Sequence, residues 1–97
     1  MVKRPEGSRE LLKNIRVMRR FLRSVREPQH KMQAEKLLNC YERPVRKAVR
    51  DLRIASNPVS WLLSSDEKRQ CAMAAFNYLF DVLTIGLGPE IQKLSEK

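Results

Sequence analysis

The sequence predicts an all-α protein, a small bundle of about four helices that includes a long antiparallel pair. Apolar residues recur at intervals of three and four along most of the chain, which is the period of an amphipathic helix. Only 3 Gly and 5 Pro occur in 97 residues, so few positions break a helix, and a hydrophobic fraction of 42% argues against disorder. A single domain of this length has a core that is marginal for a monomer, and we therefore expect a homodimer.

The first expected helix covers residues 8–27 and follows a flexible N-terminus at 1–7. Ser8 is its expected N-cap, since serine side chains satisfy free amides at helix starts. Pro28 ends the helix because a proline disfavours helical geometry in the residue before it. The apolar positions, spaced by four and three, are Leu11, Ile15, Met18, Leu22 and Val25.

The second expected helix covers residues 29–56 and contains Pro44. Proline lacks a backbone donor, so Pro44 either kinks one long helix or begins a new helix as its first residue. No glycine or polar cluster separates the two halves, and we favour one kinked helix. A short helix is then expected over residues 58–63, with Asn57 as its cap.

The last expected helix covers residues 65–86. Ser64 and Glu67 are expected to form a capping box at its start, in which each side chain satisfies a backbone amide near the other. The glycines and the proline of residues 86–89 predict the end of the helix. A frayed C-terminus is expected at 89–97.

The net charge of +9 lies in one half of the chain. Residues 1–50 carry 15 Lys and Arg against 5 Asp and Glu, whereas residues 51–97 carry 5 against 6. Arg outnumbers Lys, and its planar guanidinium matches phosphate oxygens better than an ammonium group does. The asymmetry predicts one surface that binds anions and a remainder that packs or meets a protein partner.

Basic residues form one row along each of the first two long helices, opposite the apolar positions. The first row spans about 21 Å at 1.5 Å per residue. If the helices pair through their apolar sides, both rows face outward and can contact successive phosphates of a duplex. Double-stranded RNA suits such a surface because proteins recognise it by shape and backbone contacts; double-stranded DNA is an open alternative. The candidate nucleic-acid-binding residues are Arg9, Lys13, Arg16, Arg20, Arg23, Arg43, Arg46, Arg50 and Arg53.

Three other interpretations of the basic rows stay open. A row can be a solvated helix face, although such faces usually mix both signs and these rows have few acids nearby, namely Glu10, Glu27 and Asp51. A basic amphipathic helix can lie on an acidic membrane, but the first helix lacks Trp and needs its apolar face for packing, which disfavours a membrane partner. The chain can also be a helical protein–protein interaction module, or a subunit of a larger assembly, with an acidic partner.

The last expected helix is apolar around most of its circumference. An arc that wide covers more than one groove, so the helix is central to the bundle or also packs on a second chain. Trp61 and Leu62 are expected to anchor either the core or an interface, with the core favoured, and Cys71 is expected to be a core thiol. The residues expected in the core or the dimer contact are Trp61, Phe76, Leu79, Phe80 and Leu83.

The sequence contains no pattern for catalysis or for a metal. Its only histidine is His30, and Cys40 and Cys71 lie far apart, so we expect no metal site, no cofactor and no disulfide framework. A glycine-rich phosphate loop and a nucleophile motif are also missing. We therefore expect a non-enzyme without a small-molecule substrate, in an intracellular, cytoplasmic location that keeps thiols reduced.

Export and membrane insertion are not expected either. The apolar stretch 71–87 is interrupted by Asn77 and Asp81, which makes it a poor membrane span. Residues 1–12 lack the continuous apolar run of a secretory signal, and their two glutamates disfavour a mitochondrial transit peptide.

Part of the chain resembles a known family. Cys40 lies in the long second helix and is followed three and ten positions later by basic residues, Arg43 and Arg50. Asn57 and Pro58 then open a short apolar helix. This stretch is similar to the small RNA-silencing suppressors of insect nodaviruses, which are all-helical homodimers that lay long antiparallel helices along double-stranded RNA and shield it from dicing. The resemblance implies that Arg43 and Arg50 face RNA.

Overall fold

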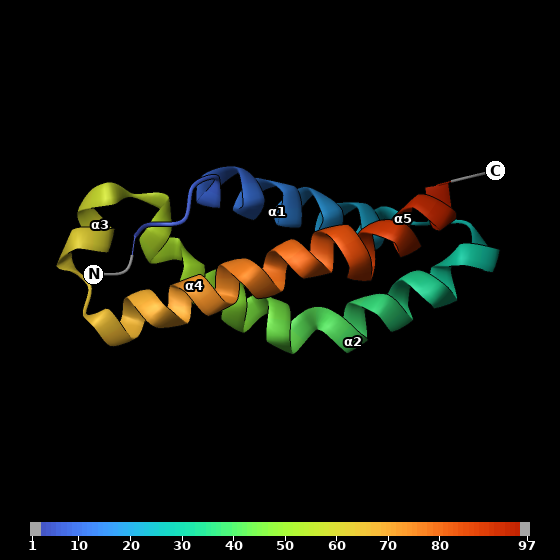
Figure 1. Cartoon of the computed structure of the whole chain (residues 1–97). Helices are drawn as coiled ribbons and strands as arrows, with labels where there is room; N and C mark the ends of the chain where they lie inside the picture. Colours follow the sequence, from blue (N-terminus) through green and yellow to red (C-terminus); the bar gives the residue numbers. More distant parts are fainter. Residues whose placement is uncertain (1–2, 96–97) are drawn as a thin grey trace.

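The computed structural model describes residues 3–95, which form helices and no strands. The predicted all-α class is thereby confirmed, while residues 1–2 and 96–97 of the expected flexible and frayed termini lie outside the described part. Figure 1 shows the order of the elements. They are α1 (Ser8–Ser24), α2 (Pro28–Leu52), the 3₁₀ turn η1 (Arg53–Ser56), α3 (Pro58–Leu63), α4 (Asp66–Asp81), the π-helical turn η2 (Val82–Gly86) and α5 (Leu87–Ser95).

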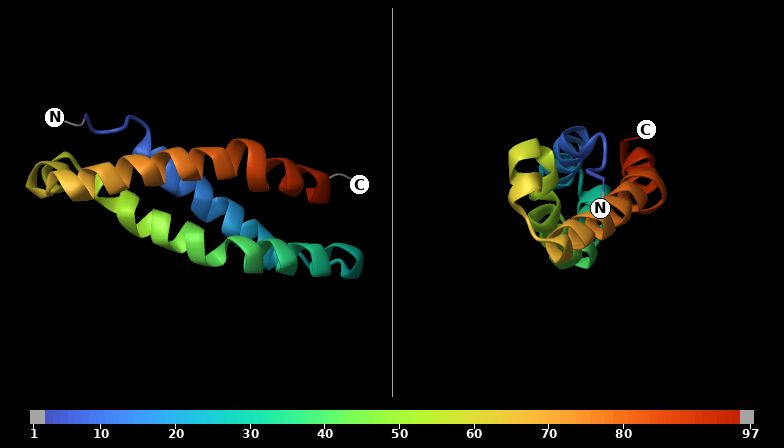
Figure 2. Two further views of the ribbon diagram at one scale, coloured as in Figure 1. Left: turned by 60° about the horizontal axis from the view of Figure 1, so that its bottom comes forward. Right: turned by 60° about the vertical axis from the view of Figure 1, so that its left-hand side comes forward.

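Three long helices lie side by side and give the molecule the shape of a rod. α2 runs antiparallel to α1, whereas α4 runs parallel to α1 and contacts both (Figure 1). Seen from nearer its end, the rod has these helices arranged around a common centre (Figure 2, right). Its extents are 48 × 20 × 19 Å, with α3 at one end and α5 towards the other.

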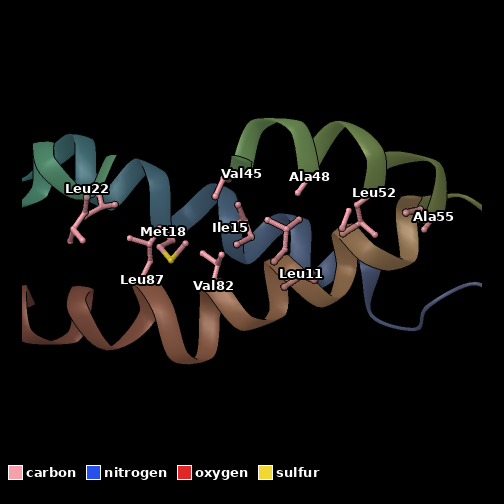
Figure 3. Close-up of a cluster of buried hydrophobic side chains, with 14 of the residues drawn as sticks. Leu11, Ile15, Met18, Leu22, Val45, Ala48, Leu52, Ala55, Val82 and Leu87 are labelled. Atoms are coloured by element: carbon pink, nitrogen blue, oxygen red, sulfur yellow. The ribbon is translucent and has the colours of Figure 1, made fainter. Parts of the chain in front are cut away.

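Side chains from the three helices meet along the centre of the rod (Figure 3). Leu11, Ile15, Met18 and Leu22 of α1 are all buried, as their spacing predicts. Burying one such side chain contributes roughly 1.5–3 kcal/mol relative to leaving it exposed. The buried apolar residues of the other elements are Ala34, Leu37, Val45, Ala48, Leu52, Ala55, Trp61, Ala72, Ala75, Leu79, Val82 and Leu87.

The caps of α3 and α4 agree only in part with the prediction. Asn57 caps α3, as predicted, by accepting a 2.8 Å hydrogen bond from the Val59 amide. The side chain that caps α4 belongs to Ser65 and not to Ser64. The Ser64 hydroxyl instead donates a 2.7 Å hydrogen bond to the Ser60 carbonyl, which closes the end of α3.

The start of α1 also corrects the prediction. Ser8 is the first helical residue rather than the N-cap, because its buried hydroxyl donates a 2.7 Å hydrogen bond to the Pro5 carbonyl. Gly7 precedes the helix with a φ of 81°, a conformation that favours glycine. Pro5 is buried, and Arg4 donates to the Ala55 carbonyl at 3.0 Å. This part of the expected flexible N-terminus is therefore docked on the bundle.

The two basic helices end earlier than expected. α1 ends at Ser24, because Pro28 imposes an extended conformation on Glu27 and the connection before it is not helical. α2 continues through Pro44 as one helix and bows along its length (Figure 1), in line with the favoured alternative. Its expected last residues, Arg53–Ser56, form the tighter η1 turn instead.

The chain continues as a helix where the sequence predicts a stop. The Leu87 amide donates to the Val82 carbonyl five residues earlier, so η2 is a wider turn than an α-helical one. Pro89 then lies in the first turn of α5, where its missing amide is tolerated. Residues 89–95 are therefore helical and not frayed.

The continuous helical run Asp66–Leu94 is 29 residues long and, by length and composition alone, apolar enough to cross a membrane. An 18-residue window of this run has a mean hydropathy of 1.4 in spite of Asn77 and Asp81, which differs from the expectation of a poor span; core helices of soluble proteins reach the same value. In the bundle the run packs against α1 and α2.

Burial, and secondarily the nearby Tyr41, raise the pKa of the Tyr78 hydroxyl above its ordinary value because both disfavour the charged phenolate.

Gly88 is required by the π turn, because a Cβ at this position would overlap the Leu83 carbonyl oxygen. Gly88→Ala should lower the free energy of unfolding by about 2–3 kcal/mol. Gly86→Ala is the control, since its Cβ would lie 3.4 Å from the Tyr41 hydroxyl, an ordinary contact, and alanine favours a helix. Urea unfolding followed by circular dichroism measures both variants, and equal stability would contradict the role assigned to Gly88.

Candidate nucleic-acid interface

A groove lined with positive charge runs between α1 and the C-terminal half of α2. It consists of two adjoining hollows that share Arg19, Val49 and Arg53, and the larger has a volume of about 630 Å³. We call the two hollows together the basic groove. Its cationic residues are Arg9, Lys13, Arg16 and Arg19 from α1, and Arg46, Arg50 and Arg53 from α2 and η1.

Helix geometry explains why these cations share one groove. The four α1 cations are spaced by three or four residues, so they share one side of α1, next to the buried stripe. The antiparallel pairing brings Arg19 of α1 close to Arg46 of α2, since both bind the same carboxylate. Leu12, Ile15 and Val49 form an aliphatic floor between the charged walls.

Glu42 lies at one end of the basic groove and compensates for part of its charge. Its Oε1 accepts 2.8 Å hydrogen bonds from Nη2 of Arg19 and from Nη2 of Arg46. The same oxygen lies 3.9 Å from Nη2 of Arg23. One carboxylate thus serves three guanidinium groups, and the groove keeps a net positive charge.

The other cations of the basic groove are available to an external anion. Five of the seven cations have no carboxylate within 4.0 Å among residues 3–95, and all five side chains are exposed. Arg9 donates to the Ser56 carbonyl at 3.3 Å and keeps its charge. The five residues are Arg9, Lys13, Arg16, Arg50 and Arg53.

The sequence predicts nine cations in one interface, and the structure brings six of them together. Arg20 and Arg43 are exposed outside the groove, and Arg23 lies beside the carboxylate at its end. Arg43 lies two turns before Arg50 and precedes Arg46, the first groove residue of α2. Arg20 follows Arg19, the last groove residue of α1, so both cations lie past the end of the groove near Glu42.

Sequence reasoning missed Arg19 and Glu42. Arg19 directly follows the buried Met18, so it lies at the border between the apolar and basic sides of α1. Glu42 precedes Arg46 by four residues, the spacing of an ion pair within a helix, and this signal was available. Its contact with Arg19 depends on how α1 and α2 align, which no local pattern encodes.

The residues expected in the core or the dimer contact fall into three groups. Trp61 and Leu79 are buried, Phe76 and Leu83 are partly buried, and Phe80 is half-exposed. The rings of Phe76 and Phe80 stack with their centroids 6.4 Å apart. The outer flank of α4 therefore carries aromatic surface that the chain itself leaves uncovered.

Two residues expected in the core are exposed instead. Trp61 is buried beneath α3 while Leu62 is turned outward, so the favoured core position is wrong for Leu62. Cys71 is exposed in a hollow between α2 and α4, so it is not a core thiol.

The described residues 3–95 contain no group of three or more His, Cys, Asp or Glu side chains that could hold a metal ion. The chain matches no protein-family model, no curated protein and no solved structure. The basic groove is therefore interpreted from its own chemistry.

Glu42→Gln removes the carboxylate that pairs with Arg19, whose side chain is only 21% exposed. We expect the free energy of unfolding to fall by about 1 kcal/mol, because a guanidinium partly shielded from water loses a charge-assisted hydrogen bond. Glu35→Gln is the control, since Glu35 is exposed on the same helix and takes part in none of the ion pairs of the described chain. Urea unfolding measures both, and an equal loss would show that the Glu42 contacts contribute nothing.

Proposed function

We propose that this chain is a non-enzymatic protein that binds double-stranded RNA without reading its sequence and shields it. The single observation that carries the proposal is the basic groove, where seven cations from neighbouring antiparallel helices line one strip of surface. The groove follows the long axis of the rod, so its charges are arrayed in one direction, as the phosphates of a nucleic-acid backbone are.

The electrostatics of the groove favour a polyanion over a single small anion. Each guanidinium that meets a phosphate releases condensed counterions, and five cations of the groove have no carboxylate partner within residues 3–95. Arginine also binds phosphate through two parallel hydrogen bonds. Contacts of this kind position a protein on a backbone and carry no sequence information.

The shape and lining of the groove favour a duplex over a single strand. Its floor is aliphatic, with Leu12, Ile15 and Val49, and it offers no aromatic platform on which bases could stack. The α1 wall from Arg9 to Arg19 is about 15 Å long, so it can follow a backbone without entering a base groove. Duplex RNA is recognised in this way because its major groove is deep and narrow.

The resemblance to the nodaviral silencing suppressors supports the same function. Arg50 lies in the basic groove, and Arg43 lies about two turns earlier on the exposed side of α2. A rod 48 Å long can cover a stretch of duplex and restrict the access of a nuclease. The proposed role is thus to sequester duplex RNA inside the cell.

The proposal includes a homodimer that forms through the apolar side shared by α1 and α4. Val17 and Phe21 lie on the flank of α1 away from the basic groove, on the other side of the buried stripe. On α4 the stacked Phe76 and Phe80 lie on the flank away from the hollow that Cys71 and Tyr78 form with α2. Val17 and Phe80 are 54% and 51% exposed, so this side offers apolar surface to a partner.

Charge and area support a second copy as that partner. The four residues of the apolar side are uncharged, so two chains of charge +9 can meet there without bringing their basic grooves together. A rod face 48 Å long and about 20 Å wide has room for the about 800 Å² that each partner of a stable dimer buries.

Arg16→Ala combined with Arg50→Ala should weaken binding to duplex RNA about tenfold or more and reduce the salt dependence by about two phosphate contacts. Lys31→Ala combined with Lys36→Ala is the control, because it removes the same charge from exposed positions of α2 outside the groove. Mobility shifts with duplex RNA, duplex DNA and single strands at two salt concentrations measure both.

The same assay decides against the proposal if the protein binds no duplex, or binds all three nucleic acids equally and without salt dependence. A different result would favour a helical protein–protein interaction module. In that case the wild type would bind an acidic protein but no duplex, and the groove variant would lose the acidic protein.

Phe80→Glu should convert the dimer into a monomer, because it places a charge in the apolar contact while the half-exposed position leaves the fold intact. Light scattering would show the mass halved, and circular dichroism would show unchanged helicity. Gln33→Glu, which adds the same charge at an exposed position of α2, should stay dimeric. A monomeric wild-type protein would contradict the dimer.

A further inference from the structure

The short helix α3 turns its apolar side towards solvent. Val59, Leu62 and Leu63 are spaced by three and four residues and so share one side of the helix. They are 61%, 68% and 82% exposed, whereas Trp61 on the opposite side is buried. Three aliphatic side chains thus stand together at one end of the rod, where α3 lies (Figure 2, left).

A buried arginine fixes this orientation. Nε of Arg69 donates to the Trp61 carbonyl, and Nη2 donates to the Leu62 carbonyl, both at 2.9 Å. The guanidinium also lies 5.8 Å from the centroid of the Trp61 ring. These contacts hold the last turn of α3 against α4. If α3 rotated to bring Leu62 and Leu63 inward, the hydrogen bonds to Arg69 would break.

Arginine side chains lie at the start of α3. Arg4 and Arg9 donate to the carbonyls of residues 55 and 56, immediately before the helix, and Arg53 begins the preceding turn. The nearest acid after the helix, Asp66, is paired with Arg69 at 3.2 Å, and the exposed Glu67 is followed by an exposed lysine. Arg4 and Arg9 therefore place positive charge at the start of the helix that carries the exposed aliphatic side chains.

This combination of charge and apolar surface fits an anionic lipid bilayer. Amphipathic helices bury aliphatic side chains about 5–10 Å into the boundary between headgroups and acyl chains, and the exposed side of α3 carries side chains of this kind. The surrounding guanidinium groups would then lie at the level of the lipid phosphates. A second copy fits less well, because it would bring the same cations together over three side chains, far short of the area of a stable dimer.

We infer that α3 is a membrane-surface anchor, which inserts Val59, Leu62 and Leu63 into an anionic bilayer and holds the rod by its end. The inference goes beyond duplex RNA binding and does not rest on it. Arg9 and Arg53 also line the end of the basic groove next to α3, whereas its other five cations lie further along the rod and stay accessible in an anchored molecule.

The test compares vesicles of phosphatidylcholine with and without phosphatidylserine, in co-sedimentation with the full chain. We expect binding to the anionic vesicles only, and a loss of about tenfold or more in Leu62→Ser combined with Leu63→Ser. Met32→Ser combined with Ile85→Ser is the matched control, because these residues are 79% and 77% exposed away from α3. This control should bind like the wild type, and circular dichroism should show all three proteins equally helical.

Three results would overturn the anchor: no binding of the wild type to anionic vesicles, equal binding by the α3 variant, or an equal loss in the control. A change in the solution mass of the α3 variant would also overturn it, by assigning these side chains to a second copy. Duplex RNA binding of the α3 variant is measured in parallel and should be unchanged. A wild type that binds vesicles through α3 but binds no RNA would refute the proposed function and leave the anchor in place.

Discussion

The basic groove depends on the burial of one apolar stripe of α1 between α2 and α4. Ile15 and Leu52 are almost completely buried, and side chains of this kind contribute roughly 1.5–3 kcal/mol each. The groove cations repel one another, but exposed unit charges 4 Å apart in water interact by only about 1 kcal/mol. Apolar burial is therefore sufficient to hold like charges side by side. Glu42 reduces the repulsion where Arg19 and Arg46 come closest.

The parts of the fold that follow from local sequence are those with a strong period or a specific side-chain chemistry. The apolar stripe of α1 and the Asn57 cap belong to this class. The continuation through η2 does not, because Gly86 and Gly88 are typical of a helix end and only the π turn lets the chain pass Pro89 as a helix. The rows of cations could be read from the sequence, whereas the pairing of Arg19 with a carboxylate on α2 requires the tertiary alignment.

The short helix α3 shows how a distant residue overrides a local pattern. Trp61 and Leu62 are neighbours in sequence, and apolar character alone does not say which of them is buried. Arg69 decides between them, because its guanidinium needs the Trp61 ring and both carbonyls, and it reaches them from the next helix. Disagreement between local pattern and structure is typical of functional positions, and here it leaves aliphatic side chains in solvent.

The distribution of charge along the chain explains why one small rod can offer three surfaces. The excess of cations lies in residues 1–50, which form α1 and most of α2, whereas α4 comes from the nearly neutral half. Any two of the three helices share one side of the rod. The side of α1 and α2 combines two basic rows, while the side of α1 and α4 combines the uncharged flank of α1 with aromatic residues. A partner on the side of α1 and α4 would leave the basic groove open, because the groove lies between α1 and α2.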